Sequence, residues 1–252
     1  MLDRHNRMRE LESSLLILIS EIRTDHPTIS MRSMYYMLRP EGIGRDLFEL
    51  FCKGHSLQSR QQKNWYRTTD SSGVIKFDNL LIGLSITKIN QVWQSDITYY
   101  VVRENVYYIT FILDAYSRMI VGHNVSRRLL TEHTSLPALE RAIKKRKGYS
   151  LEGLIFHSDG GGQYYDKEFL RLTRKYKIVN SMCEYAWENG KAERINGIIK
   201  NNYLKHWNIK SFEELTDGVD RAVQLYNEKK PHIGLNRQTP KEFETKNLNV
   251  MS

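Results

Sequence analysis

The chain has 252 residues, of which 40% are hydrophobic and 27% charged, an ordinary composition for a globular protein of one or two domains. Its 38 Lys and Arg residues outnumber its 29 Asp and Glu residues, and the net charge of +9 favours polyanionic partners such as nucleic acid. Two cysteines exclude a disulfide framework and fit a reducing cytoplasm. The apolar run over 15–19 is too short to cross a bilayer, so we expect no membrane association.

The amino-terminal part of the chain has the apolar spacing of short helices. Helices are predicted over 4–24, 30–38 and 45–52. Ser30 is the expected N-cap of the second helix, and a glycine-containing turn precedes the third. Because two short helices around such a turn are typical of a helix-turn-helix unit, residues 1–56 are predicted to be a DNA-binding segment, with Arg45 as a candidate contact. A small helical bundle that packs against the main domain is the alternative.

Residues 57–90 show little periodicity. Basic residues such as Lys63 and Arg67 are scattered among polar ones, which indicates an extended basic linker. Such a linker either contacts a nucleic-acid backbone or is a solvated connector, and the sequence leaves both interpretations open.

From residue 91 onward the pattern changes to strands and then to alternating strands and helices. Strands are predicted over 92–102, 106–113, 119–125, 154–156 and 178–180, and helices over 131–147, 166–176 and 189–203. The first three strands have short connections and form an antiparallel meander. The resulting order βββαβαβα is that of the ribonuclease-H fold, so residues 91–245 are predicted to be an α/β core with a mixed five-stranded sheet and helices on both faces.

Two aspartates stand out in this predicted sheet. Asp96 lies inside the first strand, where aspartate is uncommon, although an outward-facing residue on a half-exposed strand would also explain it. Asp159 follows the fourth strand, at the edge where open α/β sheets place ligands, although a turn or helix-cap aspartate is possible because three glycines follow. In a ribonuclease-H sheet the first and fourth strands are neighbours, so the two carboxylates are expected to meet.

A third acid, Glu193, lies on the predicted helix over 189–203. Glu193, Asn196, Gly197 and Lys200 share one polar face, separate from the apolar stripe. Lys200 is two turns from Glu193, roughly 10 Å along the helix. The acid would hold a metal ion while the lysine holds a substrate phosphate; a solvated surface pair is the alternative.

Three carboxylates without histidine or cysteine partners favour a hard ion such as Mg²⁺ or Mn²⁺. Two such ions about 4 Å apart serve phosphodiester chemistry, because one activates the attacking oxygen and the other stabilises the leaving one. His157 either orients this site or is a structural histidine. Asp114 competes for a place in the site, but the turn that follows it explains it more simply.

Taken together, these motifs resemble the DDE transposases of the bacterial insertion sequence 3 family, whose core is similar to retroviral integrase. The segments that carry the resemblance are Q-V-W-Q-S-D-I-T-Y (91–99), D-A-Y-S-R (114–118), H-S-D-G-G-G-Q-Y (157–164), A-E-R-I-N-G-I-I-K (192–200), Y-N (226–227) and P-H-I-G-L-N-R-Q-T-P (231–240). The resemblance covers about 90–245, and residues 27–56 look like the truncated helix-turn-helix segment that precedes this core.

The resemblance implies metal-dependent cleavage of DNA at element ends, followed by attack of the freed 3′-OH on a second phosphodiester. It assigns metal binding and catalysis to Asp96, Asp159 and Glu193, and DNA contact to Lys200. Asn196 and Arg194, on the same helix, are further candidate DNA contacts. It also implies Mg²⁺ or Mn²⁺ as cofactor, element-end and target DNA as partners, a homo-oligomer, a separate upstream-frame protein with a helix-turn-helix and leucine zipper, and a bacterial cytoplasm with nucleoid association.

One departure from the family concerns the spacing of the acids. The 33 residues 160–192 separate Asp159 from Glu193, two fewer than is usual, and the shortage falls near 183–187. Two other functions therefore stay open. One is a ribonuclease-H-type nuclease without strand transfer, against which the helical segment weighs. The other is a non-catalytic DNA-binding regulator of transposition, which the shortened loop favours.

Overall fold

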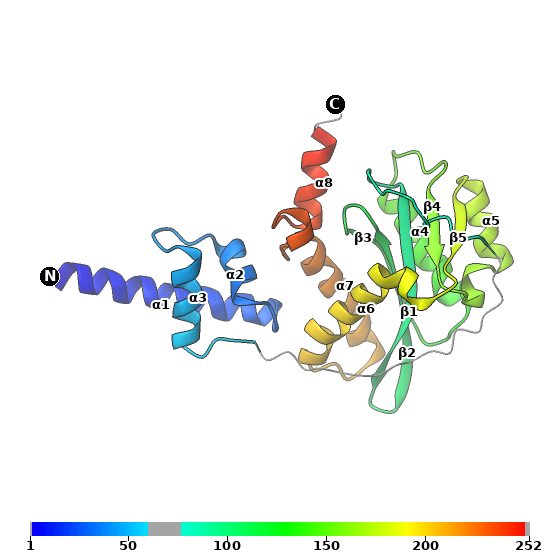
Figure 1. The fold of residues 1–252 in the computed structure, drawn as a ribbon. Coiled ribbons are helices and arrows are strands. Elements are labelled where there is room, and N and C mark those ends of the chain that lie inside the picture. Colours follow the sequence, from blue (N-terminus) through cyan, green and yellow to red (C-terminus); the bar gives the residue numbers. More distant parts are fainter. Residues whose placement is uncertain (1, 60–76, 250–252) are drawn as a thin grey trace.

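The structure, a computed structural model, describes residues 2–59 and 77–249 (Figure 1). A helical segment leads into a five-stranded sheet with helices on both faces, and further helices follow. No helix among the described residues is both long enough and apolar enough to cross a membrane.

Three helices form the amino-terminal segment: α1 (Leu2–Asp25), α2 (Met31–Leu38) and α3 (Arg45–Gly54). They pack around a small core that includes Ile19, Met34 and Phe48. The predicted cap is present, because the Ser30 hydroxyl accepts from the Ser33 amide at 3.2 Å. All three predicted helices are thus confirmed; of the apolar side chains of α1, Leu15 and Ile19 are buried whereas Leu11 and Leu18 are exposed.

The five predicted strands are also present. They are β1 (Val92–Val102), β2 (Asn105–Asp114), β3 (Ile120–Ser126), β4 (Ile155–Ser158) and β5 (Val179–Met182), in the spatial order β3-β2-β1-β4-β5. Strands β1, β2 and β3 pair antiparallel, whereas β4 runs parallel to both β1 and β5. The prediction that the first and fourth strands are neighbours is therefore confirmed.

Helices cover the two faces of the sheet in pairs. On one face, α4 (Ser135–Lys145) and α5 (Lys167–Lys175) pack with Trp93 and Phe156. On the other, α6 (Gly190–Asn202) and α7 (Phe212–Glu228) pack with Ile109, Phe111 and Leu113. Successive side chains of a strand point to opposite faces, so β1 turns Trp93, Ser95 and Ile97 toward α4 and α5, and its even-numbered residues toward α6.

The helix predicted over 131–147 is shorter than expected. A 3₁₀ turn, Thr131–His133, comes first, and α4 begins only at Ser135. Between them Thr134 is non-helical (φ −120°, ψ −87°), and its hydroxyl donates to the Leu130 carbonyl at 2.7 Å. Pro137 lacks a backbone N–H and so cannot continue a helix that began at the 3₁₀ turn. It lies in the first turn of α4, where no helical hydrogen bond needs that N–H.

Four 3₁₀ turns and two helices complete the described part of the chain. The turns are Gly162–Tyr164 (η2), Ala186–Asn189 (η3), Leu204–His206 (η4) and Ile233–Leu235 (η5), and the helices are α7 and α8 (Pro240–Asn249). Neither α7 nor α8 was among the predicted elements. Helix α8 is held to the end of α4 by a buried ion pair, in which Arg146 donates to Glu244 at 2.7 Å.

Of the predicted linker, residues 60–76 lie outside the described residues. Residues 77–90 run along the edge strand β5, where the Leu80 amide donates to the Ser181 hydroxyl at 2.9 Å. The segment ends just before β1, where the Asn90 amide donates to Asp114 at 2.7 Å. This part of the predicted linker is therefore attached to the core.

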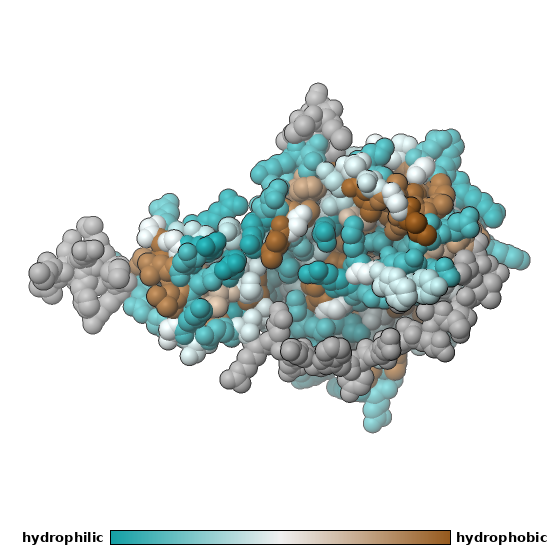
Figure 2. Space-filling model, in the orientation of Figure 1, coloured by the Kyte–Doolittle hydropathy of each residue, from teal (hydrophilic) through white to brown (hydrophobic). Residues whose placement is uncertain are grey.

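The helical segment meets the core at α6 and α7. Asp25 pairs with Arg221 at 2.6 Å, and the His26 ring nitrogen Nδ1 lies 2.9 Å from the Tyr203 hydroxyl. Figure 2 shows a largely hydrophilic surface on one side of the molecule, with apolar patches over the helical segment and over the sheet. Exposed leucines such as Leu47 and Leu50 on α3 belong to the apolar surface of that segment.

Candidate active site

The register of the sheet brings two of the predicted acids to one edge. Gln94 of β1 is paired with His157 of β4 in a parallel ladder. Asp96 and Asp159 are each two residues farther along their own chain segments, so they extend the same row of side chains on the α6 face. The prediction that the two aspartates meet depended on this pairing of strands.

Each aspartate is held by specific hydrogen bonds. Asp96 accepts from the Asn196 side-chain amide at 2.6 Å and from the Ile97 backbone amide at 2.9 Å. Asp159 accepts from the backbone amide of Gly161 at 3.2 Å. A Cβ on Gly161 would lie only 3.1 Å from the same Asp159 oxygen, so glycine leaves space for this carboxylate.

Helix α6 supplies the third acid and lies with its polar face against β1. The Asn189 side chain, just before the helix, donates to the Ser95 carbonyl at 2.8 Å, and Lys200 donates to the Thr98 hydroxyl at 2.9 Å. These two contacts hold the helix along β1 on either side of the Asn196–Asp96 bond. Glu193 is exposed at the amino-terminal end of the same face.

The three carboxylates act on one another electrostatically. Burial, then the charges of Asp159 and Glu193, raise the pKa of Asp96 to about 7. Burial also raises the pKa of Asp159, while burial and the Asp159 charge raise that of Glu193. Crowded carboxylates destabilise each other's ionised form, and a cation between them removes that repulsion.

Oxygen donors of this kind suit a hard divalent cation, so the donor chemistry fits Mg²⁺ or Mn²⁺. Within residues 2–59 and 77–249, no three Asp, Glu, His or Cys side chains lie close enough together to hold a metal ion as they stand. Glu193 is the exposed member of the trio.

The two neighbouring candidates have structural roles. Asp114 is fully buried and accepts from the backbone amides of Asn90, Tyr116 and Ser117 at 2.7–3.0 Å, as the turn interpretation predicts. His157 is also buried, and its Nδ1 lies 3.0 Å from the Ser181 hydroxyl on β5. Burial lowers the pKa of His157 to about 4, so its ring is neutral at physiological pH.

The candidate DNA contacts differ in their exposure. Arg194 is exposed on α6, and Arg45 is exposed on α3, where it pairs with Asp46 at 2.7 Å. Lys200 is partly buried. Asn196 is 7% exposed and is occupied by Asp96, so its contact in this structure is the carboxylate.

Sequence reasoning missed Asn189 and Thr98, because each contacts a residue about a hundred positions away: Asn189 contacts Ser95 of β1, and Thr98, itself on β1, contacts Lys200 of α6. Their only local signal is position: Asn189 immediately precedes the predicted helix, and Thr98 follows Asp96 by two residues on the same face. The alternation of side chains between the two faces of β1 would have placed Thr98 on the same face as Asp96.

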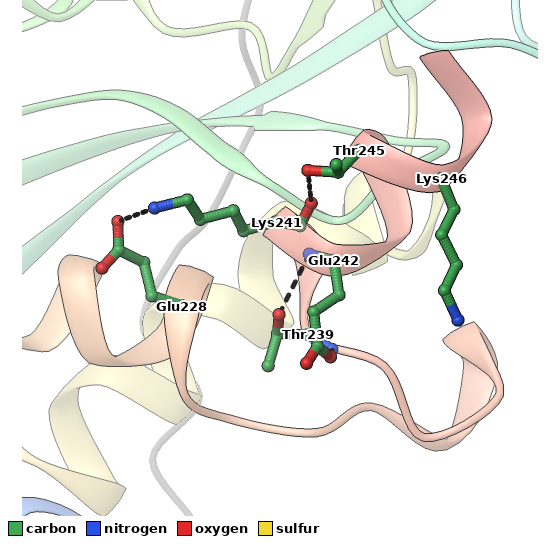
Figure 3. Close-up of a pocket in the computed structure, with 6 residues that line it drawn as sticks. All are labelled: Glu228, Thr239, Lys241, Glu242, Thr245 and Lys246. Atoms are coloured by element: carbon green, nitrogen blue, oxygen red, sulfur yellow. Dashed lines mark hydrogen bonds and ion pairs between the residues drawn. The ribbon is translucent and has the colours of Figure 1, made fainter. Parts of the chain in front are cut away.

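A shallow pocket lies elsewhere, at the junction of α7 and α8 (Figure 3). It has a volume of about 320 Å³ and is lined by Glu228, Thr239, Lys241, Glu242, Thr245 and Lys246. Lys241 is paired with Glu228 at 3.0 Å, and Thr239 caps α8 by accepting from the Glu242 amide at 3.1 Å. These contacts stabilise the helix junction, and none of the three predicted acids lines the pocket.

Two family models, both described as integrase core domain, match residues 87–186 and 174–240. The chain is 29% identical over 239 residues to the "Insertion element IS600 uncharacterized 31 kDa protein" of Shigella sonnei, covering 92% of this chain and 86% of that protein. It is 28% identical over 162 residues to the "Transposase InsF for insertion sequence IS3A" of Escherichia coli (strain K12), covering 63% of this chain and 55% of that protein.

Among solved structures, a chain of the simian T-cell lymphotropic virus intasome in complex with the PP2A regulatory subunit B56 gamma has a TM-score of 0.53. The match covers 89% of this chain and 73% of that chain, at 16% sequence identity. At this identity the likeness concerns the fold, and it confirms the predicted ribonuclease-H-like architecture.

Proposed function

The chain belongs to the insertion-sequence transposases with an integrase core domain, and we propose that it cuts DNA at the ends of such an element and joins them to a second site. In this proposal it is a polynucleotidyl transferase of the DDE type. Asp96, Asp159 and Glu193 are its catalytic carboxylates and bind Mg²⁺ or Mn²⁺, with two ions at full occupancy. When bound, such ions activate an attacking oxygen and stabilise a leaving one.

The observation that carries this proposal is the environment of Asp96. Asp96 lies partly buried between β1 and α6, and its desolvation there, together with the charges of Asp159 and Glu193, raises its pKa to about 7. A chain under no functional constraint would gain stability by neutralising that position, because burial of an unbalanced charge is unfavourable. Perturbed acids that converge at one edge of a sheet are typical of a site whose charge is completed by a ligand.

The remaining polar residues have positioning roles in this proposal. Asn196 and the Ile97 amide orient the two oxygens of Asp96, and Gly161 leaves space for Asp159. Lys200, held by Thr98, is a cation on the same helix face as Glu193 and would bind a DNA phosphate. Arg194 would add a second phosphate contact.

For the whole chain, we propose that residues 1–56 are a DNA-binding segment in which Arg45 is a phosphate contact, that 57–90 connect it to the core, and that 91–245 carry catalysis. Two element ends must be handled together, so the active form would be a homo-oligomer. An upstream-frame protein with a helix-turn-helix and leucine zipper would assist end recognition in the bacterial cytoplasm. The connection between β5 and η3 is only residues 183–185, which is where the acid spacing is short.

The test is strand transfer by the purified full chain, on DNA carrying both ends of the element that encodes it, with and without the upstream-frame protein. We expect Mg²⁺-dependent cleavage and joining, both abolished by EDTA. Asp159→Asn is expected to reduce both by about 10³-fold or more, since it removes a ligand of the reacting centre. Glu168→Gln, an exposed acid on α5, is the matched control.

The outcomes separate the three functions. Joining that survives Asp159→Asn would show that the carboxylate assignment is wrong. Cleavage without joining would favour a ribonuclease-H-type nuclease. Binding of end DNA with neither reaction, in the presence of the upstream-frame protein, would favour a non-catalytic regulator.

A further inference from the structure

Three sequence motifs that the acid site does not use converge at one place beside it. They are D-A-Y-S-R (114–118) after β2, Y-N (226–227) at the end of α7, and the segment 231–240 that follows. Asn227 attaches the end of α7, and with it the segment that follows, to strand β3. Its side chain accepts from the Ile120 amide and donates to the Ile120 carbonyl, both at 2.9 Å. The His232 ring packs edge-on against Tyr226, with ring centroids 4.7 Å apart.

The convergence gathers cations. Arg118, in a left-handed turn (φ 62°), lays its guanidinium against Gly234, where an added Cβ would lie 3.4 Å from it. Lys230 packs near Tyr226, 6.0 Å from the ring centroid, and Arg194 approaches from α6. Lys191 joins them from the start of α6 by donating to the Ala115 carbonyl at 3.1 Å.

Within the described part of the chain, none of these four cations forms an ion pair. Some other basic side chains around the core are paired, as Arg146 is with Glu244 and Arg221 with Asp25. Burial and the nearby Arg194 charge lower the pKa of Lys230 to about 8. A cluster of this kind is stabilised by a bound anion.

An unsatisfied polar atom lies at the same place. His232 is only 9% exposed, and its Nε2 has no hydrogen-bond partner among the described residues. Burial and the charges of Lys230, Arg118 and Arg194 lower the pKa of this ring to about 3. An anion bound to these cations would offset the charges that, after burial, lower the pKa of the ring.

The cluster lies between the acid site and the helical segment. Arg194 is adjacent to Glu193 in the sequence, while Lys230 acts electrostatically on His26 at the end of α1. In the segment 231–240, Arg237 stacks over the Tyr36 ring of α2, with its guanidinium carbon 4.7 Å from the ring centroid. In Figure 1 the helices α6 and α7 lie between the sheet and the helical segment.

We propose that Arg118, Arg194 and Lys230 form a phosphate clamp that grips the DNA backbone between the acid site and the helical segment. The clamp rests on the proposed function, in that DNA is the polyanion it takes. Phosphate contacts position a duplex without reading its sequence, so the clamp would hold any DNA in register for the acids while specificity resides elsewhere. Its occupant is the duplex that also contacts the helical segment.

The experiment measures binding of a generic 30-bp duplex to the full chain in EDTA, at several salt concentrations. The triple variant Arg118→Gln, Arg194→Gln, Lys230→Gln is compared with Lys167→Gln, Arg171→Gln, Arg174→Gln, which removes three exposed charges from α5 on the opposite face. We expect the clamp triple to lower the slope of log affinity against log salt by about 2 to 3, because each lost phosphate contact contributes about 0.9. The α5 triple should change it by less than about 1.

Equal slopes for the two triple variants would overturn the clamp. Binding of a short polyglutamate through the same three cations, with no binding of the duplex, would overturn it as well. If the clamp triple fails to fold, Arg194→Gln alone, an exposed position, should still lower the slope by about 0.9. Because the assay needs neither metal nor the acids, a normal clamp with absent strand transfer would reject the proposed function and leave the clamp intact.

Discussion

At the residue scale, Asp96 is a carboxylate whose ionisation destabilises the folded, metal-free chain. Its pKa of about 7 in the folded chain lies well above the ordinary value near 4, so the folded chain retains a proton that the unfolded chain loses between those pH values. The free energy of unfolding of the metal-free protein therefore falls as the pH rises from about 4 to 7, and stays low above 7.

Asp96→Asn is consequently expected to stabilise the metal-free protein. At pH 8 in EDTA the free energy of unfolding should rise by on the order of 2 kcal/mol, and the gain should disappear near pH 4, where the aspartate is already neutral. Denaturant unfolding at the two pH values measures this. Asp217→Asn, an exposed acid on α7, should have no such effect, and a loss of stability at pH 8 would contradict the argument.

Asn196 supports the same carboxylate from α6. Asn196→Ala removes the donor 2.6 Å from Asp96, and we expect the Mg²⁺ concentration for half-maximal cleavage to rise about 10- to 100-fold, as happens when supporting ligands of a metal site are lost. Asn201→Ala, on the same helix, is the matched control. An unchanged Mg²⁺ requirement would mean that Asn196 does not position Asp96.

At the scale of the elements, a single glycine sets the distance between β3 and α4. A Cβ on Gly122 would lie 2.2 Å from the Ala138 carbonyl oxygen, which belongs to the backbone and cannot rotate away. Gly122→Ala is therefore expected to reduce the free energy of unfolding by about 3 kcal/mol, at the upper end for an overpacked core. Gly54→Ala, with open space around it, should change it by less than about 1 kcal/mol.

The elements that could be predicted are those with a periodic signal. Strands β1 and β2 and helix α6 each have an apolar pattern that decides their type and buried face. The contacts of the site could not be predicted in the same way. The bonds from Asn189 to Ser95 and from Asn196 to Asp96 join residues about a hundred positions apart, and no local pattern encodes that pairing.

At the scale of the whole molecule, the carboxyl-terminal helix is fastened by a buried charge pair. Glu244 accepts from Arg146 and, at 2.5 Å, from the Ser117 hydroxyl. Glu244→Ala leaves the buried Arg146 charge with only Asp114, 3.8 Å away, as an ion-pair partner, and we expect a loss of about 3 kcal/mol in the free energy of unfolding.

The matched control is Lys241→Ala, which breaks the exposed pair with Glu228 on the same helix and should cost less than about 1 kcal/mol. The double variant Arg146→Met, Glu244→Leu should recover part of the loss, since it removes both charges of the pair while Asp114 loses its contact with Arg146. Equal effects of the two single variants would show that the buried pair does not hold α8 in place.

The contacts of α6 connect the helical segment to the acid site. The helix has 13 residues and is about 20 Å long, with Asn189 fastened to β1 at one end and Tyr203 joined to His26 of the helical segment at the other. Glu193 lies near the end that is fastened to β1, and the contact with the helical segment lies at the opposite end. We therefore expect a force that DNA exerts on the helical segment to reach the acid site through this helix.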